Sequence, residues 1–243
     1  MIIVSIIIFL FVNSTLCRNL IEIEEYSTSD NETFTYIKVT EDNLKKYLLD
    51  DDIFVIDTRK MSKSASGYIK NTIILPVSLF SYIFSIIPIG SRIIIITDEQ
   101  NKQDSIENLF DLYSYKLIGY ALFSEITSKN SFVIEVAEFN PNSNENLQKI
   151  IDKKENIIDI REINEFKKTG YVENSLLIPL SNFLTDFEKI PSQGDVYILC
   201  QSGIRSIIGM TFLKRMGYTN RFIIMKGGIN RVIEEGFPLI PLI

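Results

Sequence analysis

The chain repeats itself at a nearly constant spacing, and this internal repeat limits its possible folds more than any other feature. Five short landmarks in the first part recur later in the chain. Four of them recur after 103 residues, but the first, with its aspartate and arginine, recurs after 102, because one residue is inserted before Gly170. The paired segments are VIDTR (55–59) and IIDIR (157–161), GYIKN (67–71) and GYVEN (170–174), IILP (73–76) and LLIP (176–179), IP (87–88) and IP (190–191), and SY (114–115) and GY (217–218). The period is too long for a solenoid repeat, so we predict two copies of one domain, at 37–127 and 130–243.

Short apolar runs rich in Ile and Val alternate with helix-like segments in each copy. In the second copy the predicted strands are FVIEV, NIIDI, SLLIP, VYILC and RFIIM. The predicted helices between them are ENLQKIID, REINEFKK, LSNFLTDFEK and RSIIGMTFLKRM, and FNPNSNEN (139–146) is interpreted as a linker and helix cap. Continuous apolar strands separated by helices predict an α/β fold, in which each copy forms a small parallel sheet with helices on both faces. Ligands of such sheets bind at the carboxyl ends of the strands.

The segment CQSGIRS (200–206) stands at such a strand end, between the apolar run DVYIL and a predicted helix. Gly203 permits the φ values that a tight turn needs here, and successive N–H groups of such a turn form a nest for an anion. The helix adds its unpaired N–H groups and the positive end of its dipole. These surroundings favour the thiolate of Cys200, and Arg205 offers bidentate donors for an oxyanion. The loop therefore predicts a nucleophilic cysteine.

The composition excludes several other chemistries. The chain has no histidine, which removes histidine metal sites, Ser-His-Asp and Cys-His catalysis and histidine general bases. A net charge of -6 argues against a nucleic-acid partner, and no metal site or cofactor is predicted. The two cysteines, Cys17 and Cys200, lie in different contexts and do not indicate a disulfide framework.

A lone cysteine at a buried strand end is usually a small apolar side chain, but the Gly, Arg and two serines that follow Cys200 serve no purpose in an apolar position.

The spacing between the cysteine and the arginine discriminates between two reactions. Cysteine-dependent phosphatases carry a C-x5-R loop, whereas four residues separate Cys200 from Arg205. We expect the smaller loop to be too tight for a phosphate ester and to suit the sulfur of a persulfide or of thiosulfate. This spacing disfavours the rival interpretation of a phosphatase or an arsenate-reductase-like enzyme.

The second copy resembles the rhodanese-like (sulfurtransferase) family over residues 145–240. The matching features are IIDIRE (157–162), GYVENSLLIPL (170–180), CQSGIRS (200–206), GY (217–218) and KGG (226–228). Tyr171 departs from the family pattern, which usually has a histidine there in a structural role. The resemblance implies that Cys200 is the catalytic cysteine, which takes up a sulfane sulfur as a persulfide and passes it on without a cofactor. The substrate-binding residues that it implies are Gln201, Ser202, Gly203, Ile204, Arg205 and Ser206.

The first copy resembles a degenerate, inactive rhodanese domain. Its loop reads TDEQNKQ. The residues that replace the nucleophile, the turn glycine and the arginine are Thr97, Gln100 and Lys102. The two glycines of KGG are replaced by Ser124 and Glu125. We therefore expect this copy to serve packing or to shape the second site.

The arrangement as a whole resembles tandem rhodaneses, in which an inactive copy followed by an active one is common. It is also similar to the rhodanese pair found after metallo-β-lactamase-like domains in some bacterial proteins. The ligand motifs of that metal domain need histidine, and none is present. If the relationship holds, the chain corresponds to the rhodanese half alone.

The N-terminal segment MIIVSIIIFLFVNSTLC (1–17) is a candidate signal peptide or membrane anchor. Its apolar part suits the hydrophobic region of a signal peptide better than a membrane span, which needs about 20 residues. A preceding positive segment and a clear cleavage site are missing, so an uncleaved anchor, a buried strand or a misplaced start stay open. The expected location is exported or membrane-anchored if the segment acts as a signal, and cytoplasmic otherwise.

The sequence thus predicts a sulfurtransferase with one active site, which moves a sulfane sulfur from thiosulfate or a persulfide to a thiol or cyanide acceptor. The alternative is a persulfide carrier without turnover, or a protein-interaction module with a rhodanese fold. The expected partners are a small sulfur donor and a thiol acceptor, which could belong to a protein. Membrane contact is expected only if residues 1–17 remain as an anchor.

Overall fold

The computed structural model of the chain describes residues 4–6, 22–27, 33–99, 102, 105, 115–127, 134–135, 139–140 and 144–242. The chain clusters into two compact units, Met1–Thr58 with Gly90–Val133, and Arg59–Ile89 with Ile134–Ile243. Both units combine parallel strands with helices, which confirms the predicted α/β class. The division runs through the first predicted domain range, 37–127, because Arg59–Ile89 belongs to the second unit.

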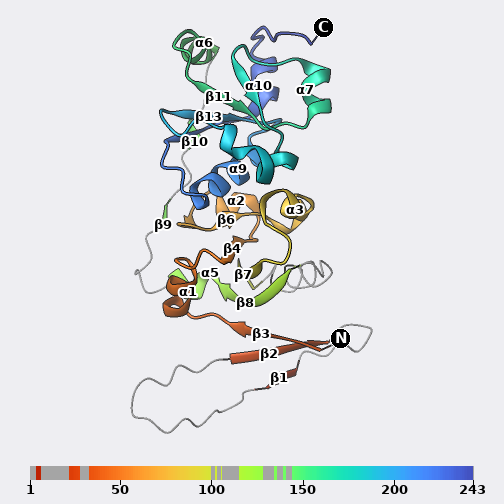
Figure 1. Ribbon diagram of the computed structural model, residues 1–243, viewed down its shortest axis with the longest axis vertical. Coiled ribbons are helices and arrows are strands. Elements are labelled where there is room, and N and C mark those ends of the chain that lie inside the picture. Colours follow the sequence, from red (N-terminus) through yellow and green to blue (C-terminus); the bar gives the residue numbers. More distant parts are fainter. Residues whose placement is uncertain are drawn as a thin grey trace. The chain divides into compact units, whose positions relative to one another are not determined.

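The strands of the first unit follow the order β1-β2-β3-β8-β7-β4 (Figure 1). The strands β3, β8, β7 and β4 are parallel to their neighbours, whereas β1 and β2 are added antiparallel at one edge. The elements are β1 (Val4–Ile6), β2 (Glu22–Ser27), β3 (Thr33–Lys38), α1 (Glu41–Tyr47), β4 (Ile53–Asp57), β7 (Arg92–Thr97), β8 (Lys116–Leu122) and α5 (Phe123–Thr127). All five residues of β4 are buried, as expected for a strand covered on both faces.

The predicted signal peptide or anchor at 1–17 falls mostly outside the described residues. Only Val4–Ile6 is described, as the edge strand β1 paired with β2. In the part of the chain that the structure describes, no helix has both the length and the apolar character needed to cross a membrane. The signal or anchor function of this segment stays a prediction.

The second unit contains a five-stranded, fully parallel sheet in the order β10-β14-β13-β11-β12. Its elements after residue 134 are β9 (Ile134–Glu135), β10 (Phe139–Asn140), α6 (Asn144–Asp152), β11 (Asn156–Asp159), α7 (Ile163–Thr169), β12 (Ser175–Leu177), η2 (Leu180–Asn182), α8 (Phe183–Asp186), η3 (Phe187–Lys189), β13 (Val196–Leu199), α9 (Ile204–Arg215), β14 (Phe222–Met225) and α10 (Gly228–Glu234). Figure 1 shows α6 and α10 on one side of this sheet and α9 on the other.

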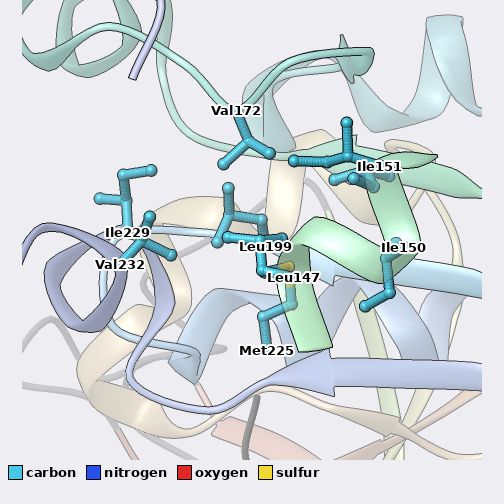
Figure 2. Packing of buried hydrophobic residues seen from close by; sticks show 9 residues of the cluster. Leu147, Ile150, Ile151, Val172, Leu199, Met225, Ile229 and Val232 are labelled. Atoms are coloured by element: carbon cyan, nitrogen blue, oxygen red, sulfur yellow. The ribbon is translucent and has the colours of Figure 1, made fainter. Parts of the chain in front are cut away.

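A compact apolar core fixes the end of β13, where the loop begins. Figure 2 shows its nine buried residues from α6, α10, the strands and the turn before β12. They are Leu147, Ile150, Ile151, Ile157, Val172, Leu199, Met225, Ile229 and Val232. Leu199 is fully buried and directly precedes Cys200. Burial of one such side chain contributes about 2 kcal/mol, so the core holds the strand end that carries the cysteine.

The first strand of this sheet differs from the prediction. FVIEV was the predicted strand, but its described residues form β9 (Ile134–Glu135), which pairs antiparallel with β5 (Tyr68–Ile69) outside the main sheet. The edge strand is β10 (Phe139–Asn140), inside the segment interpreted as a linker. Two residues are too few to show a strand periodicity, so a backbone pairing of this length left no signal in the sequence.

The two sequence copies share structural details beyond their class. The order β3-β8-β7-β4 in the first corresponds to β10-β14-β13-β11 in the second, with parallel neighbours throughout. The arginines of the repeated landmark make the same contact: Arg59 Nη2 donates to the carbonyl oxygen of Gly67 at 2.8 Å, and Arg161 Nη2 donates to that of Gly170 at 2.9 Å. The contacts span eight and nine residues, which matches the one-residue insertion read from the sequence.

The segment Arg59–Ile89 packs within the second unit. It contains α2 (Met61–Ser64), β5, β6 (Ile73–Ile74), η1 (Val77–Tyr82) and α3 (Ile83–Ile86). α3 packs against η2 and α8, and β6 packs against α9. The N–H of Ile74 donates to Thr211 Oγ1 on α9 at 3.1 Å, and both residues are buried. The hydroxyl also donates to the helix backbone at Ile207 and Ile208, so it joins β6 to α9 as both an acceptor and a donor.

Replacing Thr211 with valine should lower the free energy of unfolding by about 1–3 kcal/mol, because the Ile74 N–H would be buried without an acceptor. The shape of the side chain is nearly conserved. Thr185→Val is the matched control, because the hydroxyl of Thr185 makes an exposed bond to the Asn182 carbonyl, and we expect a loss below about 0.5 kcal/mol. Urea denaturation measures both, and equal losses would contradict the assigned role of Thr211.

Candidate active site

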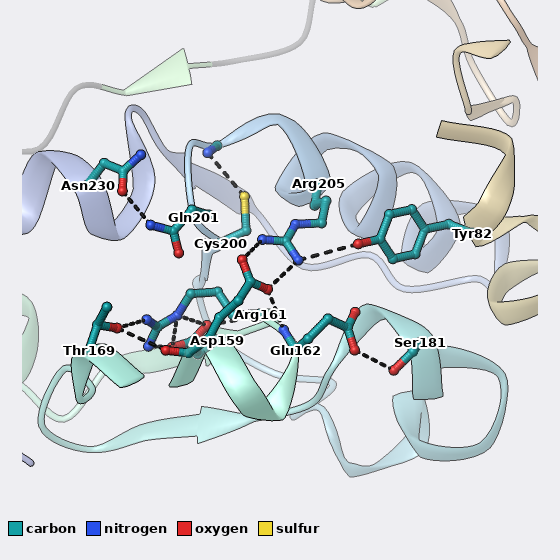
Figure 3. Close-up of polar contacts among 12 residues, drawn as sticks. Tyr82, Asp159, Arg161, Glu162, Thr169, Ser181, Cys200, Gln201, Arg205 and Asn230 are labelled. Atoms are coloured by element: carbon teal, nitrogen blue, oxygen red, sulfur yellow. Dashed lines mark hydrogen bonds and ion pairs between the residues drawn. The ribbon is translucent and has the colours of Figure 1, made fainter. Parts of the chain in front are cut away.

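Cys200 lies at the carboxyl end of β13 and at the start of the turn into α9 (Figure 3). Its side chain is fully buried, and the N–H of Gly203 donates to its Sγ at 3.1 Å. Gly203 has φ 91° and ψ -16°, a left-handed conformation that side chains rarely adopt. This turn brings the backbone back over the sulfur and places Sγ beside the first turn of a twelve-residue helix, whose N–H groups lack intrahelical partners.

The start of α10 supports the other side of the loop. The N–H of Ile229 donates to the Cys200 carbonyl oxygen at 2.8 Å, and the N–H of Asn230 donates to that of Gln201 at 3.2 Å. Gly228 makes this approach possible, because a Cβ on it would lie 2.2 Å from the Cys200 carbonyl oxygen. The start of α10, at the last glycine of KGG, therefore supports the backbone of the cysteine loop.

The remaining predicted residues of the loop have different surroundings. The Gln201 side-chain amide donates to Asn230 Oδ1, away from Sγ (Figure 3). Ser202 is exposed, and Ile204 is 43% exposed. Ser206 is fully buried on α9, and its hydroxyl has no hydrogen-bond partner among the described residues. The structure thus gathers 200–206 at the turn into α9, but among the described residues the side chains of Gln201, Ser202 and Ile204 make no hydrogen bond to Sγ.

Arg205 is held in an end-on ion pair with Glu165 of α7. Its Nη1 donates to Glu165 Oε2 and its Nη2 donates to Oε1, each at 2.6 Å. Glu165 Oε2 also accepts the N–H of Glu162 at 2.9 Å, which closes the capping box of α7. One carboxylate therefore fixes both the helix start and the arginine of the loop.

The pair shifts the acid–base properties of both groups. The hydrogen bond from Arg205 lowers the pKa of Glu165, although burial alone would raise it. Burial alone would lower the pKa of Arg205, but the hydrogen bond to Glu165 outweighs it and the net pKa is raised. Both side chains are therefore charged at neutral pH.

Replacing Glu165 with glutamine should lower the free energy of unfolding by about 1 kcal/mol at pH 7, because the charge-assisted bonds to Arg205 are weakened. The pKa of Glu165 is lower in the folded state, so its stabilisation is complete above the unfolded pKa of about 4.3 and is lost as pH falls through the folded value. Urea denaturation at pH 7 and pH 3 should show the difference from wild type shrinking at acid pH. The exposed Glu173→Gln serves as control, and a pH-independent difference would refute the assignment.

A second partner of Arg205 comes from the segment Arg59–Ile89. The hydroxyl of Tyr82 lies 3.4 Å from Arg205 Nη1 and accepts its hydrogen bond. Neither Glu165 nor Tyr82 was predicted from the sequence. Glu165 left a local signal, because Glu162 and Glu165 have the spacing of a capping box before an apolar residue, but nothing in the sequence links Tyr82 to the loop.

The corresponding loop of the first unit is built differently. Thr97 is fully buried, and its hydroxyl shares a hydrogen bond with Ser105 Oγ at 3.3 Å. Lys102 Nζ donates to the hydroxyl of Tyr120 at 2.8 Å and lies over its ring. Gln100 lies outside the described residues.

Within the described ranges, no group of three or more Cys, Asp or Glu side chains could hold a metal ion.

Known proteins are similar to the part of the chain that contains the cysteine loop. The model of the rhodanese-like domain matches residues 143–235. A sulfurtransferase of Allochromatium vinosum is 31% identical over 84 residues, which are 35% of this chain and 77% of the relative.

Solved structures give matches at lower similarity. A thiosulfate sulfurtransferase from Pseudomonas aeruginosa has a TM-score of 0.37 and 16% identity, covering 84% of this chain and 43% of its own. A rhodanese-related protein from Thermoplasma volcanium has a TM-score of 0.36 and 28% identity, covering 42% of this chain and 97% of its own. This chain thus spans less than half of the Pseudomonas protein. Since the matched region contains the cysteine loop and the Allochromatium relative is similar over most of its length, the chain belongs to the rhodanese-like family.

Proposed function

We propose that the chain is a sulfurtransferase in which Cys200 carries the sulfur as a persulfide. The observation that supports this most directly is the loop geometry: Sγ accepts the Gly203 N–H at 3.1 Å and lies beside the unpaired N–H groups of α9. Donors and a helix N-terminus of this kind stabilise the thiolate, which is the nucleophilic form of cysteine. Family membership supports the same reaction class.

The reaction consists of two displacements at sulfur. The Cys200 thiolate attacks the sulfane sulfur of thiosulfate, forming a new S–S bond, and the S–S bond of thiosulfate breaks so that sulfite leaves with the electron pair. An acceptor thiolate or cyanide then attacks the outer sulfur of the persulfide. The S–S bond to Cys200 breaks, its thiolate is regenerated, and the product is an acceptor persulfide or thiocyanate. No net oxidation and no cofactor is required.

The remaining predicted residues have supporting roles in this proposal. The loop backbone of Gln201, Ser202, Gly203 and Ile204 surrounds the transferred sulfur, and Ser206 adds a buried hydroxyl. Arg205 offers the N–H donors that Glu165 and Tyr82 do not use to the oxyanion of the leaving group. The small loop favours sulfur over a phosphate ester. Phosphatase activity is the competing outcome in the test below.

We also propose that the chain is a tandem of two rhodanese-like domains, of which the first is inactive. The shared order of four parallel strands and the paired contacts of Arg59 and Arg161 support a duplication. A further match is the positive φ of Asn71 (66°) and Asn174 (62°), which are 103 residues apart. Thr97 and Lys102 replace the nucleophile and the cation of the loop, so the first copy offers no attacking thiolate.

Steady-state assays test the proposal. Thiocyanate release from thiosulfate and cyanide, and sulfide release from thiosulfate and dithiothreitol, should both be detected with the wild-type protein. Hydrolysis of p-nitrophenyl phosphate should be absent. Phosphatase activity without sulfur transfer would overturn the proposal, and a stable persulfide without turnover would replace it with a sulfur carrier.

A further inference from the structure

Tyr82 lies on the far side of the Arg205 guanidinium from Cys200 (Figure 3). It belongs to η1, far from the cysteine loop in the sequence, yet its hydroxyl is 3.4 Å from Arg205 Nη1. The same Nη1 donates its other hydrogen to Glu165 at 2.6 Å. Two elements, η1 and α7, therefore contact the same end of one guanidinium.

A count of the donors shows what these contacts leave over. A guanidinium has five N–H donors in one plane. Three are used, two by Glu165 and one by Tyr82. Among the described residues, the Nε–H and the second N–H of Nη2 have no partner. These two donors point in parallel from one edge of the group, in the fork geometry that matches an oxyanion.

The free edge is directed toward the cysteine. In Figure 3, Cys200 lies on the side of the guanidinium opposite to Tyr82. Electrostatic interaction with Cys200 also contributes to the raised pKa of Arg205. An anion bound by the free edge would therefore lie close to Sγ.

We propose that Tyr82 is a positioning residue that keeps the free edge of Arg205 directed toward Cys200, so that the site binds donors with an oxyanion next to the sulfane sulfur. This inference rests on the proposed sulfur transfer. The ion pair with Glu165 fixes the plane of the guanidinium, and the bond to Tyr82 limits its rocking within that plane. Side-chain packing of the second unit thus uses a residue of the first sequence repeat to complete the site.

The proposal predicts a selective loss in Tyr82→Phe, which removes one hydroxyl and keeps the ring. The KM for thiosulfate should rise about fivefold, the factor that one hydrogen bond typically contributes, with kcat changed less than about twofold. Transfer from hydroxyethyl persulfide, which lacks an oxyanion, should change less than about twofold.

Tyr218→Phe is the matched control, because the Tyr218 hydroxyl donates to the carbonyl oxygens of Phe187 and Ile190 in the same unit without contacting Arg205. It should leave the kinetics with both donors unchanged. Equal losses with both donors in Tyr82→Phe, or no loss at all, would overturn the proposal, because a merely structural role would not separate the two donors.

A binding measurement separates this inference from the proposed function. Calorimetric titration of thiosulfate into Cys200→Ser and into Cys200→Ser with Tyr82→Phe needs no turnover. A Kd about fivefold weaker in the double variant supports the role of Tyr82 even if the wild type transfers no sulfur. Equal affinity, or no binding to either protein, would refute it whatever the activity of the wild type.

Discussion

Replacing Cys200 with serine should lower the rate of sulfur transfer by about a thousandfold or more. A serine hydroxyl cannot form the S–S bond of the persulfide, and it is protonated at neutral pH. The chain has no histidine that could activate it. The expected result is therefore loss of thiocyanate release from thiosulfate and cyanide, measured under conditions in which the wild-type rate is linear in enzyme concentration.

The fold should survive this change, because serine is slightly smaller than cysteine and the surrounding core remains intact. Thermal unfolding followed by circular dichroism should give a midpoint within a few degrees of wild type. Retention of more than a few per cent of the wild-type rate in a folded variant would show that another group carries the sulfur.

The second large effect is expected at Gly228. Replacing it with alanine places a Cβ 2.2 Å from the Cys200 carbonyl oxygen and 2.7 Å from the carbonyl carbon of Gln201. Both neighbours are backbone atoms, so relief requires the cysteine loop to move away from α10. We expect activity to fall about 100-fold, because small displacements of a catalytic group have effects of this size, and stability to fall by about 2–3 kcal/mol.

Gly236→Ala provides the matched control. Gly236 has φ 71°, similar to the 59° of Gly228, but a Cβ there would meet no heavy atom within 4 Å. It should lose about 1 kcal/mol from the left-handed conformation alone and keep full activity. If the two variants behaved alike, the contact between α10 and the cysteine loop would not matter for catalysis.

The sequence was sufficient to locate the cysteine loop, because its signals are local. The apolar run that becomes β13, the glycine that turns the chain and the start of α9 lie within a few residues of one another. The repeated arginine landmark was equally visible, and Arg59 and Arg161 make matching contacts in the structure. Such elements can be predicted because backbone conformation and burial pattern follow from adjacent residues.

The partners of Arg205 could not be predicted, because they are set by tertiary packing. Glu165 is 40 residues away in the sequence and Tyr82 is 123 residues away. The sequence predicted that Arg205 offers bidentate donors to an oxyanion, and the structure adds a carboxylate that balances its charge. The edge strand β10 was missed for a different reason, since its two residues are defined only by their pairing with β14.

Mass spectrometry of the Cys200 peptide tests the central claim most directly. The purified protein is treated with thiosulfate, desalted and digested without reductant, with Cys200→Ser treated in parallel. The account predicts a gain of about 32 Da on the wild-type peptide, one sulfur atom as a persulfide, which disappears after cyanide is added. Absence of this adduct with both thiosulfate and an alkyl persulfide would contradict sulfur transfer through Cys200.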